Sequence, residues 1–305
     1  MKRCIADRAA LTPEWRRLQP LVVILQEELA SFDCLEWLGS GLLAAELLCC
    51  NQATISRHSQ RVRAQLALEF QRNERGLVVT GRQQELLRLE RQIHQLFRFR
   101  GRGLLRLQVP AAGDAHLRRR LPAGWCCSPR RRTEAWVQPQ QLLENYIVDA
   151  CIVQRPQLAQ LQSDAFWVVE LFRSPLQLVA LDDHPISRQQ GLSAGDLAAQ
   201  TRLIQLPFLP ETTHRALEAL HQSLTGAAAP AAPDPAAAPV TYVHALALQL
   251  PRYQPLSVPI GRETADYLVC LKEHRHQGAL QQLLEALQQS LRMMQASGLA
   301  LQLNL

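Results

Sequence analysis

Apolar and polar positions alternate most regularly between residues 31 and 100. Helices are predicted on either side of the break at Gly39 and Gly41, and the second covers 40–48, where Ala44 and Leu48 can pack on one face. Asn51 then favours a new helix start, because its side chain accepts a hydrogen bond from an N-terminal backbone N–H. An apolar helix, a tight turn and a polar helix form a helix-turn-helix, whose second helix enters the DNA major groove.

The second helix, over residues 51–68, has an apolar and a polar side. Its apolar stripe is Ile55, Val62 and Leu66. Glutamine and arginine side chains can pair with adenine and guanine edges, and short hydroxyl side chains reach phosphates or a thymine methyl group. The residues expected to contact DNA from this helix are Gln52, Thr54, Ser56, Arg57 and Arg61.

A β-wing is predicted next. Phe70 is an apolar anchor, RNERG forms a turn, and the β-branched LVVT at 77–80 favours a strand. Arg72 and Arg75 lie in or beside the turn. We expect both to contact phosphate, which sets the register on DNA without reading sequence.

Residues 81–100 predict one long amphipathic helix of about five turns, which Gly101 and Gly103 end. Its seam consists of Leu86, Leu89, Ile93 and Leu96, with Arg, Gln and Glu elsewhere. The helix has no domain of its own to pack into, so the seam is expected to meet a second copy and form a homodimer. The alternative is that the helix packs on the C-terminal domain.

After residue 103, strands alternate with helices. Strands are expected at 104–109, 149–153, 176–181 and 267–271, and helices at 140–146, 194–200 after Ser193 as cap, and 278–295. This alternation predicts βαβ units and a largely parallel sheet. The Ala/Pro tract at 226–239 predicts a flexible surface loop.

Charge is concentrated in one segment. The chain has 305 residues, enough for two domains, and a net charge of +6. Residues 51–102 contain eleven arginines and four glutamates, a net charge of +7, so the remainder is close to neutral. The nucleotide composition of the gene could favour Arg over Lys, but it would not explain why arginines outnumber glutamates in this segment. A polyanion-binding module joined to a second domain is indicated.

The remaining composition narrows the class of protein. Eight cysteines include no CxxC, no signal peptide precedes them, and no apolar run approaches a membrane span. We expect a cytoplasmic protein with reduced thiols and no membrane partner. Cys270, His274 and His276 are a weak metal pattern, and Asp182 to His184 fit a turn. Neither GxSxG nor GxxxxGK[ST] occurs, so no enzyme, metal or cofactor is expected.

Four segments together resemble the LysR-type transcriptional regulators, from about Phe32 to Leu291. The family's recognition signature, Ser-Gln-Pro-Ala-hydrophobic-Ser-Arg, stands here as Asn51-Gln52-Ala53-Thr54-Ile55-Ser56-Arg57. Its wing signature is similar to residues 68–72 and 77–80. ENYIVDACIV at 144–153 and RSPLQLVALDDHPIS at 173–187 are similar to two strands of its C-terminal domain.

The resemblance implies an α/β protein with an N-terminal winged helix-turn-helix, a long linker helix and a two-lobed periplasmic-binding-protein-like domain. The expected division is an extension at 1–30, the DNA-binding domain at 31–81, the linker at 82–102 and the effector-binding domain at 103–298. The lobes would cover 104–162 with 259–291, and about 165–255. Assembly to a homotetramer and contact with RNA polymerase are further expectations.

A small-molecule effector, polar or anionic, would bind beyond the carboxyl ends of strands, between the lobes. By family analogy, its walls are Pro110, Ala111, Ala112 and Gly113 in one lobe and Gln205, Pro207 and Phe208 in the other.

The chain also departs from the family pattern. Ala53 replaces the usual proline, and 244–253 keeps HALALQLPRY without the usual glycines. A regulator with a lost effector cleft is therefore one alternative. A solute-binding or metabolic protein with a decayed DNA module is another, of a different class.

Overall fold

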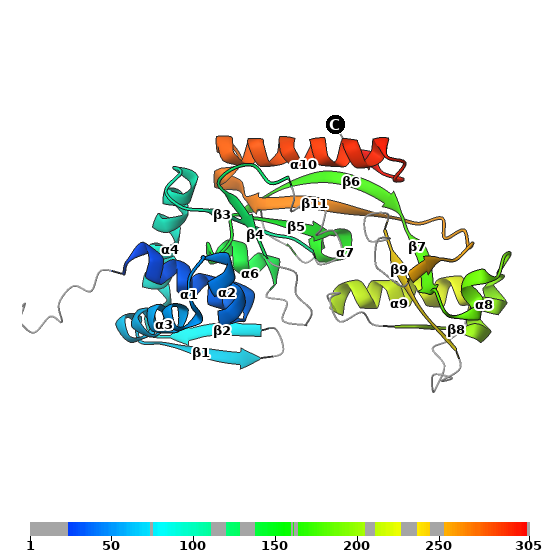
Figure 1. The fold of residues 1–305 in the computed structure, drawn as a ribbon, viewed down its shortest axis with the longest axis horizontal. Helices are drawn as coiled ribbons and strands as arrows, with labels where there is room; N and C mark the ends of the chain where they lie inside the picture. Colours follow the sequence, from blue (N-terminus) through cyan, green and yellow to red (C-terminus); the bar gives the residue numbers. More distant parts are fainter. Residues whose placement is uncertain are drawn as a thin grey trace, which may run out of the picture.

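The computed structural model describes residues 24–73, 76–110, 120–128, 138–159, 161, 164–204, 211–226, 237–244 and 253–303. The chain is a mixed α/β protein. Figure 1 shows a helical head with a two-stranded wing, a long helix beside it, and a body with a larger and a smaller sheet.

The head contains α1 (Gln26–Leu38), α2 (Gly41–Leu47) and α3 (Gln52–Leu66). Helices on both sides of the glycine break are confirmed, although α1 begins at Gln26, ahead of the expected boundary at 31. Leu29 is fully buried, so this part of the expected extension belongs to the head's core. The apolar stripe of α3 packs against α1, as predicted.

The wing is an antiparallel pair of β1 (Leu68–Asn73) and β2 (Gly76–Gly81). The Phe70 ring stacks on Phe32 of α1, with 4.9 Å between the ring centroids. The predicted anchor role of Phe70 is therefore confirmed.

The predicted long helix is α4 (Gln84–Phe99), and the residues of its predicted apolar seam are exposed in the single chain. Its polar side is buried against the rest of the chain, while the expected seam is outside. The buried residues of α4 are Leu87 and four polar ones, Arg91, His94, Gln95 and Arg98. The expectation that α4 has no domain to pack into was wrong: it packs on its own chain through ion pairs and leaves its apolar seam uncovered.

The larger sheet has the order β12-β6-β11-β5-β3-β4. Its strands are β3 (Leu105–Gln108), β4 (Trp125–Cys127), β5 (Ala150–Gln154), β6 (Phe166–Pro175), β11 (Glu263–Leu271) and β12 (Gln302–Leu303). Among the described strands of this sheet, only β3 pairs in parallel, with β4 and β5, and the other pairs are antiparallel. The largely parallel sheet was a wrong prediction, because the chain leaves along β6 and returns along β11 directly beside it.

The smaller sheet has the order β10-β7-β9-β8. Its strands are β7 (Gln177–Leu181), β8 (Thr201–Leu203), β9 (Ala238–Val243) and β10 (Tyr253–Pro255). Since β6 belongs to the larger sheet, the second lobe begins after Pro175 rather than at about 165. The Ala/Pro tract also ends earlier than expected, because Ala238 is fully buried and begins β9.

Helices cover both sheets. They are α6 (Pro139–Glu144), α7 (Arg155–Leu158), α8 (Ala194–Gln200), α9 (Glu211–Thr225) and α10 (Gly278–Ala296), with 3-10 turns at Pro185–Arg188 and Lys272–His274. The Ser193 cap of α8 is confirmed. Trp37 of the head and Leu143 of the body lie in one continuous apolar cluster, so head and larger sheet share a core. Within the described ranges, no helix is both long and apolar enough to cross a membrane.

Candidate nucleic-acid interface

Helix α3 presents its polar residues outward. Ile55 and Val62 are 1% and 0% exposed, which anchors the helix on the head. Gln52, Ser56 and Arg57 are exposed, and Thr54 is half-buried. The amphipathic pattern therefore fixes the rotation of α3, and it leaves the sequence-predicted polar side chains on the outer face.

Three side chains at the start of α3 form a hydrogen-bonded chain. Asn51 Oδ1 accepts from the Thr54 backbone N–H at 2.8 Å and from the Thr54 hydroxyl at 2.9 Å. Thr54 Oγ1 in turn accepts from Arg57 Nη2 at 3.2 Å. The cap thus orients the Arg57 guanidinium before any ligand binds, which lowers the entropic cost of a contact.

Arg61 differs from the other predicted contacts, because it already has a partner. Its Nη1 lies 2.8 Å from Glu28 Oε1 of α1, although its side chain is 62% exposed. His58 is also tied to α1, where its Nδ1 lies 2.9 Å from Ser31 Oγ. Gln60, which the sequence analysis missed, is exposed one turn after Ser56. Its i+4 spacing from Ser56 is the signal that could have identified it.

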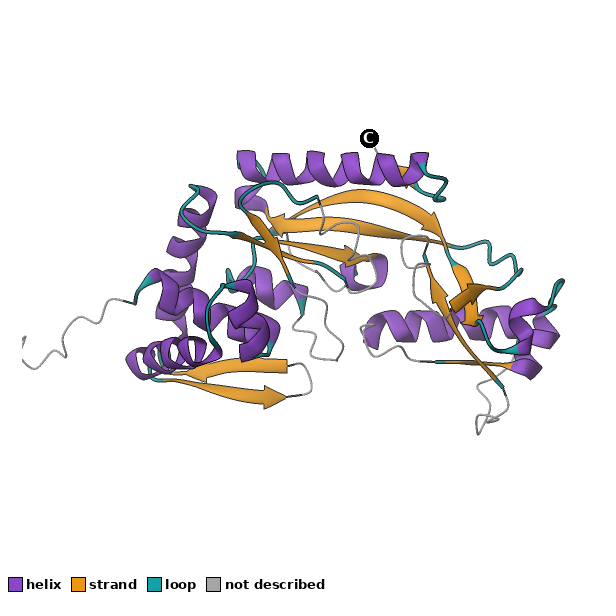
Figure 2. Cartoon of the chain, in the orientation of Figure 1, coloured by secondary structure: helices purple, strands orange, loops and turns teal. Residues whose placement is uncertain are grey.

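The wing lies beside α3 at the same edge of the head (Figure 2). Arg72 is in β1, with Leu77 opposite in the backbone register. The Arg72 side chain and all of Arg75 lie outside the described residues. Their predicted phosphate contacts therefore stay a prediction.

A buried ion-pair network holds the head on the body, and the sequence analysis missed it. Asp33 of α1 accepts from Arg91 Nε of α4 at 2.7 Å and from Arg106 Nη1 of β3 at 3.0 Å. Glu36 binds the same Arg91. Burial raises the pKa of Glu36, and the Arg91 charge opposes that shift. The available signal was two acidic residues in the otherwise apolar run LASFDCLEWL at 29–38.

The network continues into the body. Arg98 Nη2 lies 2.8 Å from Asp149 Oδ1, and Asp149 Oδ2 accepts from the Arg106 backbone N–H at 2.7 Å. Arg91 and Arg98 belong to the basic segment counted above, yet they are only 3% and 4% exposed. Part of the +7 charge is therefore neutralised inside the protein and is not available to a polyanion.

The predicted dimer seam is uncovered in the single chain. Its four residues are between 45% and 49% exposed, namely Leu86, Leu89, Ile93 and Leu96. Phe97 extends the same surface at 39% exposed. We call these five residues the α4 stripe. Contiguous apolar surface of this kind marks an interaction site in soluble proteins.

The expected effector residues fall mostly outside the description. Pro110 is buried at the end of the strand segment that begins with β3. The other expected residues lie in ranges that the structure leaves undescribed: Ala111, Ala112, Gly113, Gln205, Pro207 and Phe208. These positions neither support nor exclude a cleft.

Two buried polar groups flank Phe172 near the crossing between the lobes. Asp266 of β11 pairs with Phe172 across the sheet, and the His244 ring lies 5.8 Å from the Phe172 ring. Among the described residues, neither carboxylate oxygen of Asp266 and neither ring nitrogen of His244 has a hydrogen-bond partner. Burial raises the pKa of Asp266 to about 7 and lowers that of His244 to about 4. Both groups tend toward their neutral forms.

The histidines considered in the sequence have structural partners. His274 Nε2 lies 2.6 Å from Gln95 Oε1, which joins α4 to the end of β11. His184 Nδ1 accepts from the Ile186 backbone N–H, which makes it the cap of the turn at Pro185–Arg188. These contacts give both side chains a structural role.

No sequence profile of a protein family matches the chain, and no curated protein matches it in sequence. Solved structures do resemble it. A cysteine mutant of OxyR from Corynebacterium glutamicum is 15% identical, with a TM-score of 0.45, and the alignment covers 94% of this chain and 100% of that one. Full-length CbnR complexed with its target DNA is 17% identical, with a TM-score of 0.47 and coverage of 87% and 99%.

CrgA, a LysR-type transcriptional regulator from Neisseria meningitidis, is 16% identical, with a TM-score of 0.39 and coverage of 86% and 98%. Structural similarity at this level does not establish a function. The function therefore has to be inferred from the residues of this chain.

Proposed function

We propose that the chain is a sequence-specific, double-stranded DNA-binding transcriptional regulator of the LysR type. The observation that carries this proposal is the outer face of α3, where the Asn51 cap orients Thr54 and Arg57 beside a two-stranded wing. A buried apolar side, an exposed polar side and an adjacent wing are the parts of a winged helix-turn-helix.

Gln52 and Arg57 recognise bases, because both side chains can make two hydrogen bonds to one base edge. Thr54 and Ser56 reach phosphates or a thymine methyl group. Arg61, Arg72 and Arg75 contact phosphate, and Arg61 exchanges Glu28 for it. Such contacts make binding fall with salt.

The α4 stripe is proposed as the homodimer surface. A symmetric pair of α4 helices covers the exposed leucines, and it holds two heads at the spacing of two half-sites. Further assembly to a homotetramer and contact with RNA polymerase belong to the same proposal.

Control by a small effector is proposed from the two sheets, which β6 and β11 join as two lobes. A polar or anionic molecule would bind between them, beyond the strand ends. Thermal-shift screening with metabolites tests this, since a ligand of the folded state raises the melting temperature. If no metabolite shifts it and DNA binding is complete without additives, the regulator is constitutive.

The DNA-binding proposal is tested by selecting fragments of the source genome on the full chain and measuring their affinity by fluorescence anisotropy. Arg57→Ala should weaken the selected site by roughly tenfold or more, which corresponds to a lost base contact of about 1–3 kcal/mol. Arg100→Ala removes the same charge at the exposed end of α4 and is the matched control. Equal losses for both variants, or no enriched fragment, would favour the solute-binding or metabolic alternative.

A further inference from the structure

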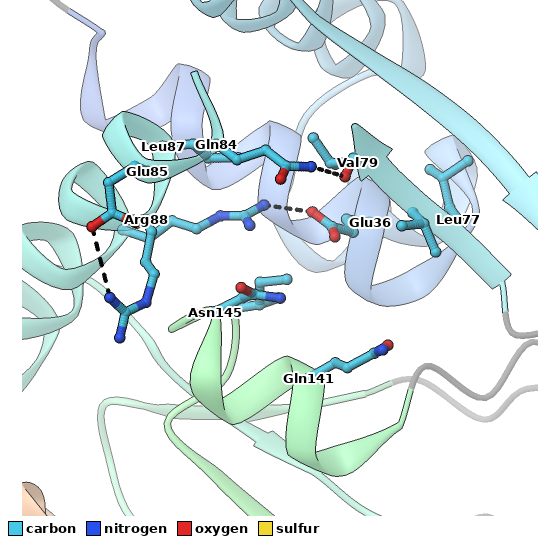
Figure 3. A pocket seen from close by; sticks show the side chains of 12 residues that line it. Glu36, Leu77, Val79, Gln84, Glu85, Leu87, Arg88, Gln141 and Asn145 are labelled. Carbon is cyan, nitrogen blue, oxygen red and sulfur yellow. Dashed lines mark hydrogen bonds and ion pairs between the residues drawn. The ribbon is translucent and has the colours of Figure 1, made fainter. Parts of the chain in front are cut away.

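A cavity of about 290 Å³ lies where the head, α4 and the body meet. The wing strand β2 forms one wall through Leu77 and Val79, α4 contributes Gln84 and Leu87, and α6 of the body closes the opposite side (Figure 3). None of the residues that line this cavity belongs to the predicted effector walls. Its volume is at the small end of ligand sites.

The buried charges at the cavity are already matched within the protein, whereas the pair at its rim is exposed. Arg91 is bound by Asp33 and Glu36, and Arg88 lies 3.9 Å from Glu85. A charged ligand that enters would therefore meet no unpaired buried counter-charge, and it would lose part of its hydration. An uncharged ligand avoids that cost.

The free hydrogen-bonding groups are carboxamides. Gln141 of α6 and Asn145, which directly follows that helix, line the cavity, and neither side chain makes a hydrogen bond within the described part of the chain (Figure 3). Each offers an N–H₂ donor and a carbonyl acceptor. Gln84 uses its N–H₂ on the Val79 carbonyl at 2.9 Å, which leaves its carbonyl oxygen as an acceptor.

Apolar side chains form the other surfaces of the cavity. Leu77, Leu87 and Ile147 come from the wing, α4 and the body respectively. A flat ring can bury its faces against them while its edge meets the carboxamides. The complementary shape is a small heterocycle or aromatic carboxamide with donors and acceptors along one edge.

We propose that this cavity binds an uncharged heterocyclic molecule of nucleobase size through Gln141 and Asn145. Because the lining comes from the wing, the linker and the body together, a bound molecule stabilises the docked head. A regulatory role for this stabilisation rests on the proposed DNA-binding function, whereas binding of the small molecule to the cavity does not.

The test uses the full chain without DNA, so its outcome is separate from that of the DNA-binding proposal. Nicotinamide and adenine are the uncharged probes, and nicotinate is the anionic counterpart of nicotinamide with the same ring. Binding is measured by ligand-observed NMR titration at neutral pH. Nicotinamide or adenine should bind, and nicotinate should bind at least tenfold more weakly than nicotinamide.

Site variants then locate the binding. Asn145→Ala and Gln141→Ala should each weaken the uncharged probes by about fivefold or more, the loss expected for one hydrogen bond. Gln140→Ala is the matched control, because Gln140 is in the same helix but bonds Glu144 outside the cavity. Circular dichroism checks that each variant is folded.

Three outcomes would overturn the proposal. They are no binding of either uncharged probe to the wild-type chain, nicotinate binding as tightly as nicotinamide, and folded Asn145 and Gln141 variants that bind like the control.

Discussion

Asp33 of α1 and Arg106 of β3 form a buried ion pair at 3.0 Å, which joins the head to the body. The same carboxylate accepts from Arg91 of α4 at 2.7 Å. One side chain therefore connects three parts of the chain that are distant in sequence. Since the Asp33 side chain is only 1% exposed, the pair is shielded from water and from salt.

Removing that carboxylate should be costly. Asp33→Ala leaves Arg106 and Arg91 buried with fewer partners, and we expect the free energy of unfolding to fall by about 3–5 kcal/mol. Urea denaturation followed by circular dichroism measures it. Glu27→Ala, at an exposed acid in the same helix, should change stability by less than about 0.5 kcal/mol. A similar small change for Asp33→Ala would show that the network does not hold the head.

The Thr54 hydroxyl should matter for DNA affinity more than for folding. Thr54→Val keeps the shape but removes the acceptor that orients Arg57 and the donor to Asn51. Affinity for the selected site should fall by roughly three- to tenfold, the equivalent of about 0.5–1.5 kcal/mol. Thr264→Val, on β11, is the control for losing a hydroxyl elsewhere. Unchanged affinity in Thr54→Val would mean that Arg57 does not depend on this orientation.

The α4 stripe should control the oligomeric state. Leu89→Asp combined with Ile93→Asp places two charges where apolar side chains would meet, so we expect monomers and a large loss of DNA affinity. Light scattering after size-exclusion chromatography measures the mass. Val168→Asp alters an apolar residue that is 40% exposed on β6, and it should leave the oligomer intact. A double variant with the wild-type mass would place the dimer surface elsewhere.

Asp266 should make stability depend on pH. Burial raises its pKa from 3.8 to about 7, so the folded state holds a proton that the unfolded state has lost between those values. Wild-type stability should therefore fall as the pH rises through this window and stay low above it. Asn cannot ionise, so Asp266→Asn should be more stable than wild type by about 1–3 kcal/mol at pH 8.

The stabilities of wild type and Asp266→Asn should also be compared at pH 4, which tests the direction of the pH dependence. There Asp266 is protonated in the folded protein, and the advantage of Asp266→Asn should shrink toward zero. Urea unfolding of both proteins at the two pH values measures this. Asp182→Asn, at an exposed acid, is the control for the loss of one charge. An advantage that is equal at both pH values would exclude ionisation of Asp266 as its cause.

Local patterns predicted most elements of the head, apart from the start of α1, and one helix cap in the body. The Asn51 and Ser193 caps, the Ile55–Val62–Leu66 stripe and the wing hairpin depend on residues a few positions apart, where spacing alone decides the interaction. The three leucines and one isoleucine of the α4 seam were identified from spacing for the same reason. The proposed DNA-contacting residues of α3 also came from this local pattern.

Long-range contacts decided what periodicity could not. The apolar period of α4 identified its seam, but it said nothing about Asp33, Glu36 and Asp149, which bury the opposite side through ion pairs. Likewise, the antiparallel pairing of β6 with β11 depends on where the chain re-enters the larger sheet. The sequence by itself determined helices, caps and the wing, because these follow from near neighbours. Only the tertiary structure decided which side of α4 is covered and where the cavity beside it lies. A buried charge is stable only beside partners, and folding brings those partners from elsewhere in the chain.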